Sequence, residues 1–273
     1  MADTEKVLRR FDATDLRRRF GTAGLLQAVE RRGFTDLHVS IRSAATALPH
    51  VELHGSKAGR NLLLLEACLS EATVPASFFA ERGFSVAGTT ELAVAYWVRE
   101  QDPSRPFTGR RPPLPLQEHP GLGVLPLAFR VIRDIAVDLG KDGVACVPKF
   151  YHDAYIFYRS RLFLFLDGRE QGRFERLMSD LARVPLAHAS WALVDRHVRD
   201  QRGGAVEWRP GFQVCPLSDQ LTTYFNSGEY AALVDDGAAQ DQYFCQEKDY
   251  LPALVASTES KLRQARKGRQ TKE

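Results

Sequence analysis

Apolar residues near the start of the chain follow a helical spacing. Between residues 14 and 32 they share one predicted helical face: Leu16, Phe20, Leu25, Leu26 and Val29. Such a stripe is typical of an amphipathic helix that packs on a core. Thr14 or Asp15 can cap its start, and Gly33 marks its end.

The pattern then changes to that of β-strands. Residues 36–43 alternate, with Leu37, Val39 and Ile41 on one face, and residues 50–54 form a second short segment. Residues 61–69 are almost continuously apolar, as in a central strand that is covered on both faces. These segments predict neighbouring strands of one sheet.

Beyond this sheet the local signals are mixed. Residues 75–82 favour a short helix, and residues 91–100 fit either a strand or a helix. Residues 102–115 contain five prolines together with Arg105, Arg110 and Arg111. Proline lacks the N–H that a sheet ladder needs, so we expect an extended loop here.

The stretch from Gln117 to Asp167 carries the clearest order of elements. A Gly121-Leu122-Gly123 turn precedes a predicted helix over 124–139, an apolar strand over 144–147, an aromatic helix and a further apolar strand. The short strand–helix–strand spacing predicts that 144–147 lies parallel to the strand before the glycine turn. Backbone N–H groups at the start of such a helix could hold a phosphate, although a plain tight turn has the same sequence.

The rest of the chain is predicted to be helical with a few strands. Residues 170–183 and 185–199 favour helices, and 205–208 with 212–216 favour a pair of strands. Residues 258–273 form a basic tail without an apolar face.

Composition narrows the functional classes. A net charge of +3 over 273 residues is too small to indicate nucleic-acid binding. Cys68, Cys146, Cys215 and Cys245 are widely spaced, which favours free thiols over a disulfide framework or a zinc site. The charged N-terminus and the short apolar runs predict a cytoplasmic protein without a membrane span. No metal-binding pattern and no GxSxG motif is present.

The Gln117–Asp167 block resembles the coenzyme-A-binding half of the GCN5-related N-acetyltransferases. That family has Arg or Gln, two residues, Gly, one residue, then Gly or Ala, and here Glu118, Gly121 and Gly123 fill these places, with Gln117 just before. Ala136 lies where the family has a helical alanine. The later family pattern is matched at these positions: Tyr151, Ala154, Tyr158 and Phe163.

The block departs from the family pattern at three positions. Glu118 replaces a basic or amide group, Tyr151 replaces an asparagine, and Leu162 replaces a glycine. The order LPLQEHPGLG, VPKFYH, FLD is also similar to uncharacterised bacterial proteins.

The resemblance implies acetyl-CoA or another acyl-CoA as a substrate and an unknown amine, on a small molecule or a protein, as the acceptor. It places the cofactor on these residues: Gly121, Leu122, Gly123, Val124, Leu125 and Ala154. Tyr158 would protonate the leaving thiolate, although its aromatic neighbours also fit a packing role. Glu66 would be the base if burial raised its pKa, although a charge paired with Arg42 or Arg60 is the alternative. His54, His119 and His152 are further candidates for the base.

Together these signals predict an α+β fold, with a mixed, mostly antiparallel sheet flanked by helices. We expect a flexible segment over 1–13, an acyltransferase-like core over 14–168, a helical and strand extension over 169–257 and the basic tail. The expected function is acyl-CoA-dependent N-acyl transfer. The alternative is a non-catalytic domain of the same fold that binds a protein or a small ligand.

Overall fold

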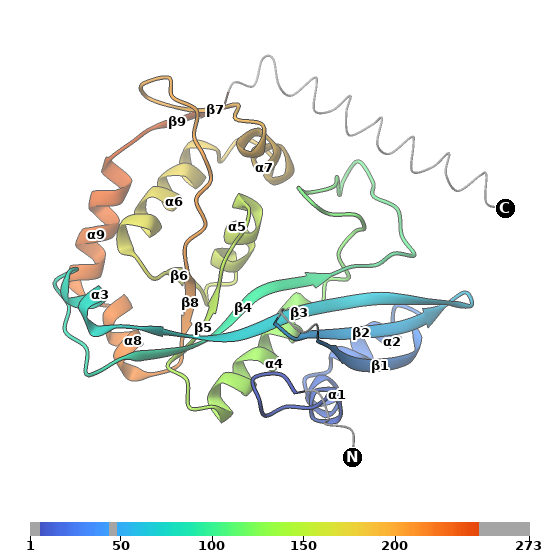
Figure 1. The fold of residues 1–273 in the computed structure, drawn as a ribbon. Helices are drawn as coiled ribbons and strands as arrows, with labels where there is room; N and C mark the ends of the chain where they lie inside the picture. Colours follow the sequence, from blue (N-terminus) through green and yellow to red (C-terminus); the bar gives the residue numbers. More distant parts are fainter. Residues whose placement is uncertain (1–5, 44–47, 246–273) are drawn as a thin grey trace. The chain divides into compact units, whose positions relative to one another are not determined.

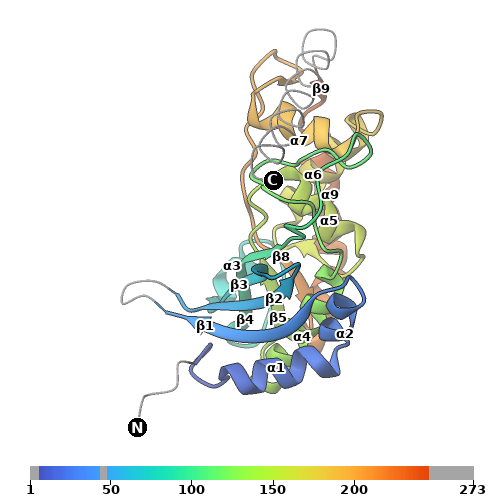
Figure 2. The ribbon, with the colours of Figure 1, turned by 90° about the vertical axis from the view of Figure 1, so that its right-hand side faces the viewer.

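The computed structural model describes residues 6–43 and 48–245 (Figures 1 and 2). The chain divides into two compact units. Unit 1 takes the described residues up to Ser104, with Gly121–Val147 and Val214–Tyr224. Unit 2 takes Arg105–Pro120, Pro148–Gln213 and the described residues from Phe225 onward. Each unit therefore includes residues from both sides of residue 168, where the sequence led us to expect the core to end.

Two helices open unit 1 where one was expected. α1 covers Ala13–Thr22 and α2 covers Leu25–Glu30. Gly24 between them has a φ of 79°, a left-handed conformation that ends the first helix and that glycine adopts without strain. The cap of α1 is Asp12, whose side chain accepts the N–H groups of Thr14 and Asp15. Val7, in the segment expected to be flexible, is fully buried.

Four antiparallel strands form most of the sheet of unit 1. They are β1 (Thr35–Arg42), β2 (His50–Lys57), β3 (Arg60–Val74) and β4 (Thr90–Glu100), each paired with the next, and the short helix α3 covers Ala76–Ala80. Residues 91–100 are thus a strand. The buried residues of β2 are Val51, Leu53 and Gly55, while His50, Glu52 and His54 alternate with them.

A strand–helix–strand connection follows β4 in sequence, as its spacing predicted. Helix α4 covers Leu125–Asp138, and β5 covers Gly143–Cys146. β5 runs parallel to β4, from the pair Leu92↔Gly143 to Ala95↔Cys146, which confirms the predicted pairing. Figure 1 shows α1, α2 and α4 on the same side of the sheet.

The predicted strand pair near residue 210 is wrong. Residues 205–208 form no strand, whereas β8 (Gln213–Pro216) lies beside β5 in the main sheet. The amides of Leu217 and Ser218 donate to the Asp142 carbonyl and fix this end of β8. Helix α8 (Asp219–Phe225) follows and brings Tyr224 into edge contact with Phe79, with ring centroids 5.0 Å apart. Local alternation could not reveal a pairing between segments this far apart.

Unit 2 is built mainly of helices. They are α5 (Tyr151–Arg159), α6 (Gly168–Asp180), α7 (Leu186–Val194) and α9 (Gly228–Ala239), with the short strand β6 at Leu164–Phe165. The helix expected over 185–199 ends early, because Arg196 takes a left-handed φ of 60°. Residues Val198–Asp200 form β7 instead, antiparallel to β9 (Tyr243–Cys245).

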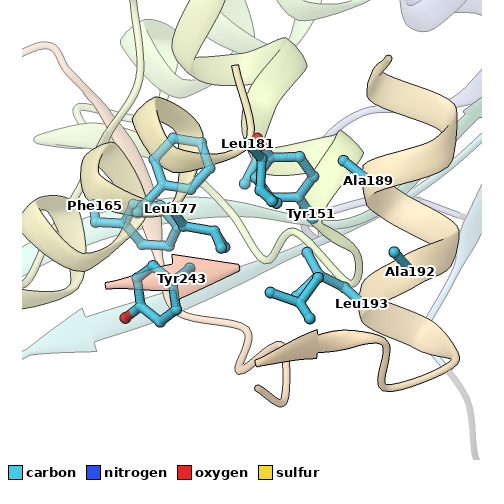
Figure 3. Close-up of a cluster of buried hydrophobic side chains, with 11 residues drawn as sticks. Tyr151, Phe165, Leu177, Leu181, Ala189, Ala192, Leu193 and Tyr243 are labelled. Carbon is cyan, nitrogen blue, oxygen red and sulfur yellow. The ribbon is translucent and has the colours of Figure 1, made fainter. Parts of the chain in front are cut away.

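The core of unit 2 brings α5, α6, α7 and β9 together. Figure 3 shows Tyr151 beside Leu181 and Ala189, with Tyr243 and Leu193 below them. Phe165 and Phe174 belong to the same buried cluster. The aromatic residues of α5 therefore pack in a core, which is the alternative that the sequence left open beside a catalytic role.

The expected α+β class with a mixed, mostly antiparallel sheet is confirmed. Among the described residues, no helix is long and apolar enough to cross a membrane. The basic tail over 258–273 lies outside the described residues.

Candidate functional site

The glycine turn before α4 surrounds a carboxylate of its own chain. Glu100, the last residue of β4, is held by the backbone N–H groups of Leu122, Gly123 and Val124. A Cβ on Gly121 would lie 2.6 Å from the Glu100 Oε1, so a side chain here would displace this carboxylate. The N–H groups that the sequence assigned to a pyrophosphate are therefore already occupied by a carboxyl group of the same chain.

The favourable contacts of the Glu100 carboxyl group do not offset the cost of burying its charge. Burial raises its pKa above the ordinary value, and the three N–H groups and the nearby Arg32 charge counter this only in part. Its Oε2 is buried and has no hydrogen-bond partner in the described part of the chain. Gly123 has a φ of 69°, and a Cβ there would come within 3.5 Å of the Arg32 Nη2. Arg32 is thus the cation beside this loop.

Glu66 lies at the centre of a second charged group, on the sheet face opposite Val51 and Leu53. Its Oε1 is 2.9 Å from the Arg42 Nη2 and 2.9 Å from the His50 Nδ1. Its Oε2 accepts the Trp97 indole N–H at 3.2 Å and an Arg99 N–H at 3.0 Å. The partners come from β1, β2 and β4, so this Glu66 cluster connects four neighbouring strands.

This environment sets the acidity of Glu66. Burial disfavours the carboxylate, but the His50 hydrogen bond, the Arg99 charge and the Trp97 hydrogen bond outweigh it and lower the pKa below its ordinary value. The expectation that burial would raise this pKa is therefore wrong, because it neglected the partners. The alternative, a carboxylate paired with Arg42, describes the observed contacts. The role of Glu66 as a base stays a prediction and has lost its physical support.

Leu125 begins α4 in unit 1, whereas Ala154 and Tyr158 lie in unit 2. Ala154 is fully buried in the aromatic core, and its carbonyl accepts the Gln213 side chain at 3.2 Å. The Tyr158 hydroxyl donates to the Glu175 Oε1 at 3.0 Å. Burial and the Glu175 charge raise the pKa of Tyr158, so the phenol keeps its proton at neutral pH. Tyr158 also packs its ring edge-on against Phe174.

Tyr158 and Glu175 lie in the wall of a pocket of about 420 Å³ in unit 2. Tyr151 and Tyr155 add further aromatic surface, and Arg159 adds a cation. Apolar side chains between the end of α6 and the start of α7 add to the lining: Leu181, Val184 and Leu186. The volume falls within the range of sites for small organic ligands.

The candidate histidines have structural partners. His54 lies 3.0 Å from the Glu52 carboxylate. His152 is buried, and burial lowers its pKa to about 4, so its ring is neutral at pH 7. Within the described residues, no group of three or more His, Cys, Asp or Glu side chains could hold a metal ion.

Two carboxylates central to these sites were missed in the sequence. Glu100 alternates with Trp97 and Arg99 along β4 and therefore points to the helix-covered face, where an acid is unexpected. The position of Glu100 in the alternation of β4 was therefore a usable signal of a buried carboxyl group. Glu175 follows Gln171 by one helical turn in α6. This spacing is common on solvated helix faces, so the sequence gave no signal that Glu175 belongs to a site.

No protein-family model and no curated protein matches this chain.

Proposed function

We propose that this chain is a non-catalytic, acyltransferase-like protein that binds a small ligand in the pocket of unit 2. The observation that carries this proposal is the Glu100 carboxylate inside the glycine turn. A turn that binds a pyrophosphate through its N–H groups gains nothing from a buried carboxyl group that is hydrogen-bonded to the same N–H groups.

Where Glu100 is ionised, it works against an anionic cofactor at this turn. Two like unit charges 4 Å apart near a protein surface repel by about 4 kcal/mol. A penalty of this size weakens an affinity by about a thousandfold. Arg32 offsets part of the charge of Glu100, but it is one cation beside one carboxylate. The loop therefore offers little net attraction to an anionic cofactor.

The pocket of unit 2 supports the binding half of the proposal. It combines a fixed carboxylate, phenol rings and apolar side chains in one wall, the mixture that small-molecule sites use. All its lining residues lie within unit 2.

The experiment is a titration of the full chain with acetyl-CoA, followed by thermal unfolding and calorimetry at pH 7.5. A ligand at a hundred times its Kd stabilises the folded state by about 2.7 kcal/mol, so binding would be visible. We expect no shift for the wild type. Saturable binding of acetyl-CoA by the wild type at sub-millimolar concentration would overturn the proposal.

Two variants identify the cause. Glu100→Gln keeps the shape of the side chain and removes its charge, whereas Glu91→Gln changes an acid elsewhere on β4. If Glu100→Gln gains acetyl-CoA binding and Glu91→Gln does not, the Glu100 carboxylate is what prevents acetyl-CoA from binding at the glycine turn.

N-acyl transfer is the second candidate, and the β4–β5 pair favours it. The two parallel strands are joined through the glycine turn and α4, and their pairing ends at Ala95↔Cys146 although β4 continues to Glu100. In this candidate an acyl-CoA displaces Glu100 from the turn and an amine is the acceptor. Loss of acetyl-CoA binding in Gly121→Glu and Gly123→Glu, with the fold retained, would then assign the cofactor to the turn.

A further inference from the structure

The carboxylate of Glu175 is held in place before any ligand arrives. Its Oε1 accepts the Tyr158 hydroxyl from α5 at 3.0 Å and the Gln171 amide, one helical turn earlier in α6, at 2.8 Å. Gln171 is itself 1% exposed, and its side-chain oxygen accepts the Phe165 N–H at 2.8 Å. A buried amide thus fixes the acid that lines the pocket. Such preorganisation lowers the entropic cost of binding.

The walls around this acid suit an organic cation. Tyr151, Tyr155 and Tyr158 line the pocket, and Met178 adds a polarisable apolar side chain. Aromatic faces attract ammonium groups, and a carboxylate in the same wall adds a charge-assisted hydrogen bond.

Arg159 limits the charge that the ligand can carry. It lines the same pocket but is exposed, whereas Gln171 behind Glu175 is buried. A ligand with its ammonium on Glu175 and an apolar body toward Leu181 and Leu186 avoids this guanidinium. A second ammonium on the ligand would be repelled by it.

We propose that the pocket of unit 2 binds a small amphipathic monoamine, with its ammonium group on Glu175 beside the tyrosines and its apolar body toward Leu181 and Leu186. This inference rests on the proposed function and specifies its ligand class.

The test uses three probes on the full chain, measured by calorimetry and thermal unfolding. They are 2-phenylethylamine, its neutral analogue 2-phenylethanol, and spermidine as a polyamine. We expect 2-phenylethylamine to bind at least about 10-fold more tightly than either of the others, the usual effect of a hydrogen bond to a charged group. Equal binding of the amine and the alcohol, or no binding of the amine at millimolar concentration, would overturn the ligand class.

The matched variants are Glu175→Gln and Glu229→Gln. Glu229 is exposed at the start of α9 in the same unit and lies outside the pocket. We expect Glu175→Gln to weaken the amine by about 10-fold or more and to leave the alcohol unchanged, with no effect of Glu229→Gln. Unchanged amine affinity in folded Glu175→Gln would also contradict the inference. The comparison of probes needs only the wild type, so it decides even if Glu175→Gln fails to fold.

The two proposals fail in different measurements. Binding of acetyl-CoA to the glycine turn removes the proposed function, whereas a wrong ligand class appears only with the amine probes. A neutral probe that binds as well as the amine leaves a ligand pocket of another specificity.

Discussion

Glu66 and Glu100 lie on neighbouring strands, yet their carboxyl groups are shifted in opposite directions. Glu66 has two arginines, a histidine and an indole N–H around it, and its pKa is lowered. Glu100 has backbone N–H groups and one nearby cation, Arg32, and its pKa is raised by burial. Burial acts in the same sense on both acids, so the partners decide the result. For this reason a buried acid in a sequence does not by itself indicate a base.

The pH dependence of stability should show the contribution of Glu66. Because its pKa is lower in the folded than in the unfolded chain, the stabilisation is present above the unfolded value of about 4.3 and is lost as the pH falls through the folded value. Glu66→Gln removes the charge and replaces one of the two acceptor oxygens with an amide NH2, which cannot accept the hydrogen bonds made to that oxygen. We expect a loss of roughly 1–3 kcal/mol in the free energy of unfolding at pH 7, and a smaller loss at pH 3.5.

Urea unfolding followed by circular dichroism at pH 7, 5 and 3.5 measures this difference. Glu229→Gln, at an exposed position, serves as the control and should follow the wild type at each pH. A loss for Glu66→Gln that stays the same down to pH 3.5 would mean that the charge of Glu66 contributes nothing.

At the scale of elements, the sequence was most informative where one hydrophobic period continued without interruption. The helix over 124–139 and the strand over 144–147 were predicted within one residue of α4 and β5. Predictions were poorest where a backbone conformation ends an element. Arg196 takes a positive φ that no sequence pattern announces, and it stops α7 before residue 199. Gly24 did carry a signal, but the apolar stripe continued across it.

The contact between α6 and α9 depends on small residues. A Cβ on Gly172 would lie 1.9 Å from the Val234 carbonyl oxygen, and one on Gly237 would lie 2.2 Å from the Arg169 carbonyl oxygen. The obstacles are backbone atoms, which cannot rotate away as a side chain can. The two helices therefore approach each other closely only because these positions lack a side chain.

Gly172→Ala should accordingly destabilise the protein although alanine is the better helix former. We expect a loss of roughly 1–3 kcal/mol, the usual cost of overpacking, in place of the gain of up to about 1 kcal/mol that helix propensity alone predicts. The control is Gly228→Ala in α9, where an added Cβ would meet nothing within 4 Å. Urea unfolding of both variants gives the comparison, and equal stabilities would refute the close contact.

At the scale of the whole molecule, the two units alternate along the chain. Unit 1 is interrupted twice by segments of unit 2, and its last segment, Val214–Tyr224, follows Val147 only after a long excursion. Sequence patterns of short range identified β8 as a strand but could not supply its neighbour, because pairing with β5 is a contact distant in sequence. The same limit applies to the Glu66 cluster, which assembles from four strands. Fold class was therefore accessible from the sequence, while the sites depended on contacts that it did not reveal.

This organisation predicts that unit 1 cannot be obtained by a single cut. A chain that ends at Val147 lacks β8 and α8, so β5 has an unpaired edge and Phe79 loses its contact with Tyr224. Leu221 and Tyr224 are both fully buried, and removing side chains of this size from a core costs about 2–5 kcal/mol each. Such a loss approaches the whole stability of an ordinary domain. We expect the chain 1–147 to show no cooperative thermal transition by circular dichroism.

A second chain, in which a flexible Gly/Ser linker of about ten residues joins residues 214–224 to residue 147, should recover a transition. A cooperative transition in the chain 1–147, unchanged by adding this segment, would show that β8 and α8 are not part of its folding unit.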